Sequence, residues 1–229
     1  MNDRSPIAVA KVPDTEHELR LYRIGADHAI RIMGKGELMN TRAIGTERAL
    51  AELACARLAS RDHARVLVGG LGMGFTLAAA LELLGPNAEA VVAELVPEVV
   101  EWNRTHVGDA AGHPLRDPRT AVHVGDVAEQ IRDPGDGFDA IMLDVDNGPE
   151  AILRRENNWL YGSDGLAGMR AALRSGGTLA IWSAGPDRAF TLSLQRAGFR
   201  VSEHSLRAHR SSKGKGKGKG PRHHAWLAN

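Results

Sequence analysis

The segment 66–75 is the feature that most constrains the fold of this chain of 229 residues. An apolar strand runs into a loop rich in glycine, whose glycines are Gly69, Gly70, Gly72 and Gly74. A helix predicted over 75–84 follows, and a second apolar strand over 90–94 ends in Glu94. Glycines let the backbone approach a ligand, a helix start offers N–H groups to an anion, and an acid at that strand end accepts bonds from ribose hydroxyls. The segment therefore predicts a βαβ unit that binds a nucleoside.

The spacing of the glycines indicates the class of nucleoside ligand. A dinucleotide fingerprint needs Gly-x-Gly-x-x-Gly, and counting from Gly70 places Phe75 at the last glycine position. The observed spacing, Gly70-x-Gly72-x-Gly74, is typical of class I enzymes that use S-adenosylmethionine. A glycine-rich turn with a purely structural role is the alternative interpretation.

Three acids follow apolar strands and are expected at one edge of a parallel sheet, where ligands bind. They are Glu94, Asp126 and Asp144. Glu94 is expected to bind the ribose hydroxyls, and Asp126 the adenine amine, with the Val127 N–H facing a ring nitrogen. Asp144 is expected nearest the reacting centre. For Asp126, capping of the following helix is the alternative.

Strands and helices alternate along most of the chain, which predicts a parallel sheet with helices on both faces. The expected strands are 64–69, 90–94, 120–125, 138–143 and 177–183, and the expected helices are 46–59, capped by Thr46, then 75–84, 97–105, 126–131, 163–174 and 187–197. Two final strands, 200–207 and 223–227, predict a closing antiparallel hairpin. We therefore expect an α/β, Rossmann-like class I methyltransferase fold with a mostly parallel seven-stranded sheet, spanning residues 46–229. Residues 1–45 are expected to form a small N-terminal β-hairpin element from strands 17–24 and 28–33.

Composition limits the classes of partner. The net charge is +1 and 43% of residues are hydrophobic, so neither a polyanion partner nor disorder is indicated. A single cysteine suits a reducing compartment, and no apolar run reaches the ~20 residues that a membrane span needs, so we expect a cytoplasmic protein. No His or Cys cluster has the spacing of a metal site.

A low-complexity run of alternating Lys and Gly covers residues 213–220, between the last two strands. A solvated hairpin loop is one interpretation, and a basic finger that attracts an anionic substrate is the other. Because no aromatic side chains are interleaved to stack on bases, the run argues against a nucleic-acid partner.

The segments 68–74, 92–94 and 138–149 together resemble the spermidine synthase (polyamine aminopropyltransferase) family, over about residues 18 to 200. The resemblance implies transfer of an aminopropyl group from decarboxylated S-adenosylmethionine to an amine, with an acid at Asp144 orienting and deprotonating that amine. The donor-binding candidates are Gly69, Gly70, Leu71, Gly72, Gly74, Glu94, Leu95, Asp126, Val127 and Asp144.

Several positions depart from the pattern of that family. Gly72 stands where the family's loop has an acid, and Asn147 replaces the second acid of the Asp-Ser-x-Asp-Pro motif, with Asp146 adjacent. A Tyr-His-Glu helix start corresponds to Gly45-Thr46-Glu47. Burying a dication needs paired carboxylates, so the diamine site looks depleted. The catalytic candidates are Asp144 and Asp146, and the acceptor-binding candidates are Glu47, Asn147, Trp159 and Tyr161, the last two with loop packing as the alternative.

Three functions are therefore open. The first is methyl transfer from S-adenosylmethionine to an amine or hydroxyl of a small molecule. The second is aminopropyl or alkyl transfer from decarboxylated S-adenosylmethionine, and the third is a cofactor-binding module without catalysis. Exposed edges of the N-terminal strands invite pairing with a second copy, so we expect a homodimer.

Overall fold

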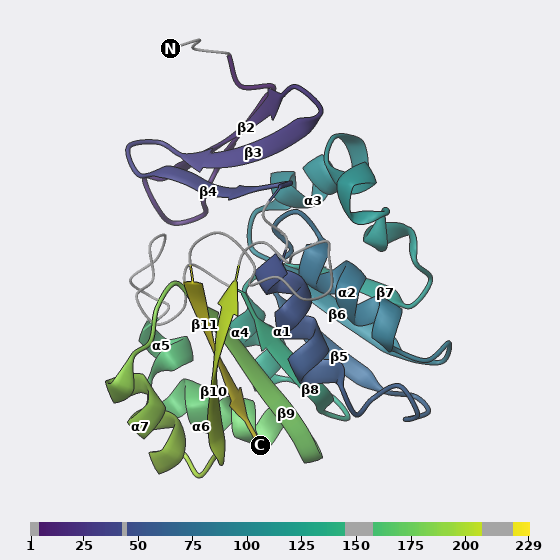
Figure 1. Ribbon diagram of the computed structural model, residues 1–229, viewed down its shortest axis with the longest axis vertical. Helices are drawn as coiled ribbons and strands as arrows, with labels where there is room; N and C mark the ends of the chain where they lie inside the picture. The colour runs from purple at the N-terminus through teal and green to yellow at the C-terminus, as the bar shows by residue number, and fades with distance from the viewer. Residues whose placement is uncertain (1–4, 43–44, 145–157, 208–221) are drawn as a thin grey trace.

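The computed structural model describes residues 5–42, 45–144, 158–207 and 222–229 (Figure 1). Two sheets organise these residues. The smaller is antiparallel, with the order β1-β2-β3-β4, and its strands are β1 (Ala8–Lys11), β2 (Glu18–Ile24), β3 (Asp27–Ile32) and β4 (Gly36–Asn40). The larger has seven strands in the order β10-β11-β9-β8-β5-β6-β7.

The larger sheet is mostly parallel. Its strands are β5 (Arg65–Gly69), β6 (Glu89–Glu94), β7 (Thr120–Val124), β8 (Phe138–Leu143), β9 (Leu173–Ser183), β10 (Val201–Arg207) and β11 (Arg222–Ala228). Parallel pairing joins β5 to β6 and β8, β6 to β7, and β8 to β9, whereas β11 is antiparallel to both β9 and β10. The predicted fold class, including the closing hairpin, is confirmed.

Helices cover both faces of this sheet. They are α1 (Gly45–Cys55), α2 (Phe75–Leu83), α3 (Pro97–Thr105), α4 (Val127–Arg132), α5 (Asn158–Tyr161), α6 (Ser163–Ala172) and α7 (Arg188–Arg196), with short 3-10 turns at Gly108–Ala111 and Pro114–Arg116. One core packs α1 and α2 on the side chains of Val66, Val68, Met142 and Ala180. A second core packs α4, α6 and α7 on the opposite side chains, among them Leu67, Ile141 and Ile181. The alternation of side chains along each strand decides which core a residue joins.

The N-terminal element differs from the sequence prediction, because it has four strands rather than two. The missed strands, β1 and β4, are the two edges of the small sheet and are only 4 and 5 residues long, too short for a clear alternation. A third core joins this sheet to the large one through Leu21, Ile30, Met73 and Trp102. The small sheet consequently lies over the carboxyl edge of the large sheet, above the start of α1 (Figure 1).

Two smaller expectations were also wrong. Helix α1 begins at Gly45 and ends at Cys55 instead of residue 59. Thr46 therefore lies inside the helix, and its hydroxyl donates to Glu47 Oε2 at 2.8 Å instead of capping. In addition, β9 begins at Leu173, before the Gly176-Gly177 pair, with a register shift opposite Phe138 and Ala140. Within the described residues, no helix has the length and apolar character that crossing a membrane would require.

Candidate active site

The glycine loop connects β5 to α2 at the carboxyl edge of the large sheet. Gly70, Gly72 and Gly74 have φ values of 88°, 52° and 84°, in the left-handed region that favours glycine. Gly69 needs to be small for a different reason, since a Cβ there would lie 2.8 Å from Leu143 Cδ2. The loop that the sequence predicted is thus a tight turn in which backbone conformation or lack of space favours glycine at each of these positions.

Glu94, at the end of β6, holds this loop in place. Its Oε2 accepts hydrogen bonds from the N–H groups of Leu71 at 2.9 Å and Gly72 at 3.4 Å, and its Oε1 accepts one from Val96 N at 3.0 Å. The side chain is buried, and burial raises the pKa of its carboxyl group. Glu94 therefore orders the backbone of the loop, and binding of ribose by the same carboxylate stays a prediction.

Asn103 is a loop contact that the sequence analysis missed. This residue of α3 is 2% exposed, and its Nδ2 donates to the carbonyl oxygen of Gly72 at 2.7 Å and to that of Val99 at 2.9 Å. The available signal was a polar side chain on the buried face of an amphipathic helix, together with Val99, Val100 and Trp102. The glycine loop is consequently held from both sides, by Glu94 through its N–H groups and by Asn103 through a carbonyl group.

Asp126 takes the capping role that the sequence analysis gave as the alternative. It is the N-cap of α4, and its Oδ1 accepts a hydrogen bond from Ala128 N at 2.9 Å. Val127 begins that helix and is buried, while Leu95, after β6, packs against the core beneath the small sheet. Contact of these residues with adenine stays a prediction.

Glu47 and Asp144, which are far apart in the chain, lie near enough at this edge to interact electrostatically. Asp144 follows β8 and is half-buried, and its Oδ2 accepts a hydrogen bond from Thr76 Oγ1 at 3.3 Å. Burial, followed by the negative charge of Glu47, raises the pKa of Asp144 to about 7. Burial also raises the pKa of Glu47. The first turn of α1 and the end of β8 thus place two carboxyl groups with raised proton affinity near the glycine loop.

Met39 of β4 occupies the space next to Gly72. A Cβ built at Gly72 would lie 3.0 Å from Met39 Sδ and 3.3 Å from its Cε. The position that lacks the acid of the family is therefore packed by a thioether from the small sheet, which fills the volume that a larger residue at position 72 would need.

Trp159 and Tyr161 lie on the other face of the sheet from Glu47 and Asp144. The guanidinium of Arg132 lies over the Trp159 ring, 4.0 Å from the ring centroid. Tyr161 is buried, and its ring packs edge to face with that of Phe190 at a centroid distance of 5.6 Å. Both belong to the core beneath α4, α6 and α7, in agreement with the packing alternative. Asp146 and Asn147, like the Lys-Gly run 213–220, lie outside the described residues.

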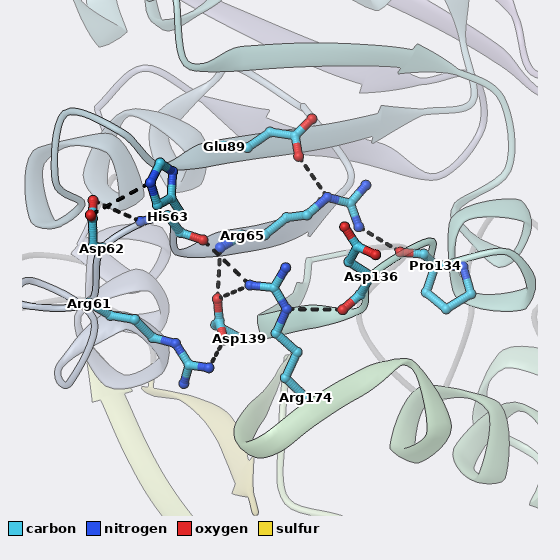
Figure 2. A network of polar contacts seen from close by, with 9 residues as sticks. All are labelled: Arg61, Asp62, His63, Arg65, Glu89, Pro134, Asp136, Asp139 and Arg174. Atoms are coloured by element: carbon cyan, nitrogen blue, oxygen red, sulfur yellow. Dashed lines mark hydrogen bonds and ion pairs between the residues drawn. The ribbon is translucent and has the colours of Figure 1, made fainter.

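The opposite edge of the sheet holds a polar cavity of about 420 Å³. Next to it, the fully buried carboxylate of Asp139 pairs with Arg61 and Arg174, each at 2.9 Å, and accepts a hydrogen bond from Arg65 N at 2.8 Å (Figure 2). Arg65 also pairs with Glu89 at 2.6 Å. These contacts close the amino ends of β5, β6, β8 and β9, away from the predicted site. Among the described residues, no group of three His, Cys, Asp or Glu side chains is arranged to hold a metal ion.

Comparisons with known proteins agree with this arrangement, although no family model matches the chain. A polyamine aminopropyltransferase of Korarchaeum cryptofilum is 27% identical over 128 residues, covering 56% of this chain and 38% of the relative. One of Corynebacterium efficiens is 28% identical over 183 residues, covering 79% of this chain and 33% of the relative. The chain thus spans about a third of the length of these curated relatives.

Solved structures show the same fold. Spermidine synthase in complex with the transition-state analogue AdoDATO aligns with a TM-score of 0.71 at 16% identity, over 98% of this chain and 72% of that one. Spermidine synthase from Thermotoga maritima gives a TM-score of 0.72 at 14% identity, with the same coverage. A precorrin-6y C5,15-methyltransferase from Geobacter metallireducens gives 0.56 at 16% identity, over 80% of this chain and 86% of that one. The resemblance to spermidine synthases drawn from the sequence motifs is confirmed.

Proposed function

We propose that this protein is a transferase that moves an aminopropyl group from decarboxylated S-adenosylmethionine to the nitrogen of a small amine. The observation that carries the proposal is the pair of carboxyl groups of Glu47 and Asp144 beside the glycine loop. Sequence similarity to polyamine aminopropyltransferases and the fold shared with spermidine synthases favour this reaction over methyl transfer, which the sequence analysis placed first.

The chemistry of the two carboxyl groups suits an amine acceptor. An amine is a cation at neutral pH and must lose a proton before its nitrogen can attack. A carboxyl group with a pKa of about 7, as burial and Glu47 give Asp144, is matched to that proton transfer at physiological pH. Glu47 adds a second negative charge that attracts the ammonium form of the acceptor before transfer.

The proposed transfer forms one bond to the acceptor nitrogen and breaks one bond in the donor. The lone pair of the acceptor nitrogen forms a bond to the donor carbon next to the sulfonium. The carbon–sulfur bond breaks and leaves its electrons on sulfur, which becomes a neutral thioether. The nitrogen gives up one proton, and Asp144 receives it. Alignment of the two reactants by the loop and the carboxylates supplies much of the acceleration.

The donor is assigned to the glycine loop in this proposal. Glu94 and Asn103 fix the loop through hydrogen bonds within the protein, which lowers the ordering cost of binding. With three hydrogen bonds to backbone N–H groups, the Glu94 carboxylate has about one lone-pair site left for a ribose hydroxyl, and Asp126 with Val127 is the proposed contact for adenine.

Methyl transfer from S-adenosylmethionine is the second candidate, and one observation favours it. Position 72 carries no acid, and Met39 fills the adjacent space with a neutral thioether. An acid there would attract an ammonium tail and repel a carboxylate tail, so its loss removes a charge that discriminates against the methionine carboxylate.

Calorimetry with the two donors tests the proposal, followed by mass spectrometry of the products formed with a panel of amines. We expect tighter binding of the decarboxylated donor and products enlarged by an aminopropyl group. Asp144→Asn is the matched control, expected to keep donor binding and lose transfer. Methylated products would establish the second candidate instead. Failure of both donors and their thioether products to bind would overturn both candidates in favour of a module without catalysis.

A further inference from the structure

Trp182 and His223 lie beside Asp144 on the same face and the same edge of the sheet. Leu143 of β8 pairs with Ile181 of β9, so Asp144 comes level with Trp182. Trp182 in turn pairs with Ala225 of β11, two residues from His223. Met142, Ala180 and Ala225 all join the core under α1 and α2, and side chains alternate along a strand. Asp144, Trp182 and His223 therefore follow one another across neighbouring strands, on the side covered by α1.

Among the residues that the structure describes, neither aromatic side chain has a hydrogen-bond partner for its buried polar atom. Trp182 Nε1 and His223 Nδ1 have neither solvent nor a partner in the part of the chain that the structure describes. The two rings meet edge to face, with centroids 4.8 Å apart and planes at 75°. Each residue as a whole remains partly exposed, although the two polar atoms themselves are buried. Buried polar groups in folded proteins are almost always paired, so two adjacent exceptions beside a candidate site call for a partner.

The chemistry of the two atoms narrows the choice of partner. The indole N–H of Trp182 is a donor only. Burial lowers the pKa of His223, which favours the neutral ring, and with the proton on Nε2 its Nδ1 is an acceptor. A hydroxyl group accepts from the first and donates to the second. An ammonium group has three donors and no acceptor, so it leaves the indole N–H unpaired.

We propose that Trp182 and His223 form the distal end of the acceptor site and bind the hydroxyl group of an amino alcohol whose nitrogen lies at Glu47 and Asp144. This inference rests on the proposed function for the role of the two carboxyl groups. Neighbouring strands are about 4.8 Å apart, so the span from Asp144 to this pair suits a chain of about four carbons between nitrogen and oxygen. The acceptor is then distinguished from a diamine of equal length by its oxygen.

The indole N–H resonance of Trp182 reports directly on this contact and does not require turnover. The protein is labelled with ¹⁵N-tryptophan, and Trp182→Phe identifies the resonance. The probes are 4-aminobutan-1-ol and 1,4-diaminobutane. We expect the amino alcohol to shift the Trp182 resonance downfield and to bind roughly tenfold more tightly than the diamine, because only the hydroxyl group pairs the buried N–H. In Trp182→Phe the preference between the two compounds should disappear.

Two other tryptophans serve as internal controls. Trp226 already donates to Thr191 Oγ1 at 2.8 Å, and it belongs, like Trp159, to the core on the other face, so neither resonance should move. The inference is overturned if the Trp182 resonance does not move, or if the diamine moves it as far as the amino alcohol does. An internal water that already bridges the two side chains would leave the resonance unmoved. If the resonance responds but no amine is alkylated, only the proposed function fails. If diamines are alkylated without a response at Trp182, only this inference fails.

Discussion

Met39 of the small sheet packs against Gly72 of the glycine loop and leaves little room for a side chain at position 72. The Sδ atom of Met39 would lie 3.0 Å from a Cβ at that position, where the backbone has a φ of 52°. The small sheet thereby limits the space available at this position of the glycine loop. A change at either residue should alter the effect of a change at the other.

Introducing the acid of the family by Gly72→Asp should lower the free energy of unfolding by about 1–3 kcal/mol, from left-handed strain and from contact with Met39. Combining it with Met39→Ala should recover the part of the lost stability that comes from the contact with Met39. A double-mutant cycle should therefore give a coupling energy of about 0.5–3 kcal/mol. Urea denaturation of the two single variants and the double variant measures this coupling. Strict additivity would contradict the packing argument. Calorimetry on the double variant should show a greater preference for the decarboxylated donor.

The pKa of Asp144 should respond in opposite directions to its two neighbours. Removing the negative charge by Glu47→Gln should lower it from about 7, and removing the hydroxyl group by Thr76→Val should raise it further. Carboxyl ¹³C NMR titration of the three proteins gives the values. Shifts in the same direction, or none, would show that the two neighbours do not act on this group.

The raised pKa of Asp144 also sets a pH dependence of stability. The folded protein holds this proton up to about pH 7, whereas the unfolded chain releases it near 3.8. Folding therefore binds a proton between these values, and the contribution of Asp144 to stability is full below pH 3.8 and is lost as pH rises to about 7. Asp144→Asn has no proton to release at this position, so its stability lacks this pH-dependent loss. The free energy of unfolding of the variant minus that of the wild type, measured by urea denaturation, should therefore grow from pH 4 to 7.5. A constant difference across that range would refute the assignment.

A site residue can be predicted from the sequence when the pattern that indicates it lies within a short segment of the chain. The glycine loop, Glu94 and Asp144 lie within short patterns of strand and turn, and Glu47 is in a helix start, so each was named as a candidate from the sequence. Their meeting, and the contacts of Met39 with Gly72 and of Trp182 with His223, depend on sheet order and register, which no local pattern specifies. Strands β1 and β4 were missed for a related reason, since short edge strands gain their stability from pairing.

Glu94→Gln tests the hydrogen bonds by which Glu94 holds the glycine loop. The amide NH₂ group would face backbone N–H donors where a carboxylate oxygen now accepts, leaving buried donors unpaired at a cost of about 1–3 kcal/mol. We expect a corresponding loss of stability in urea and weaker binding of the thioether product by calorimetry. Glu89→Gln, at the other end of β6, is the matched control. Its carboxylate is half exposed and paired with Arg65, so its loss should cost less than about 1 kcal/mol and leave ligand affinity unchanged.

The network around Asp139 should affect stability without affecting the candidate site. Asp139→Ala leaves Arg65 N and the half-buried guanidinium of Arg174 without their carboxylate partner (Figure 2). Breaking a buried ion pair from one side costs about 3–5 kcal/mol. Arg61→Ala should cost less than about 1 kcal/mol, because its side chain is 42% exposed. Urea denaturation should rank the two variants in this order, while donor affinity measured well below the unfolding transition stays at the wild-type value. Loss of donor affinity in folded Asp139→Ala protein would show that the amino edge of the sheet is coupled to the carboxyl edge.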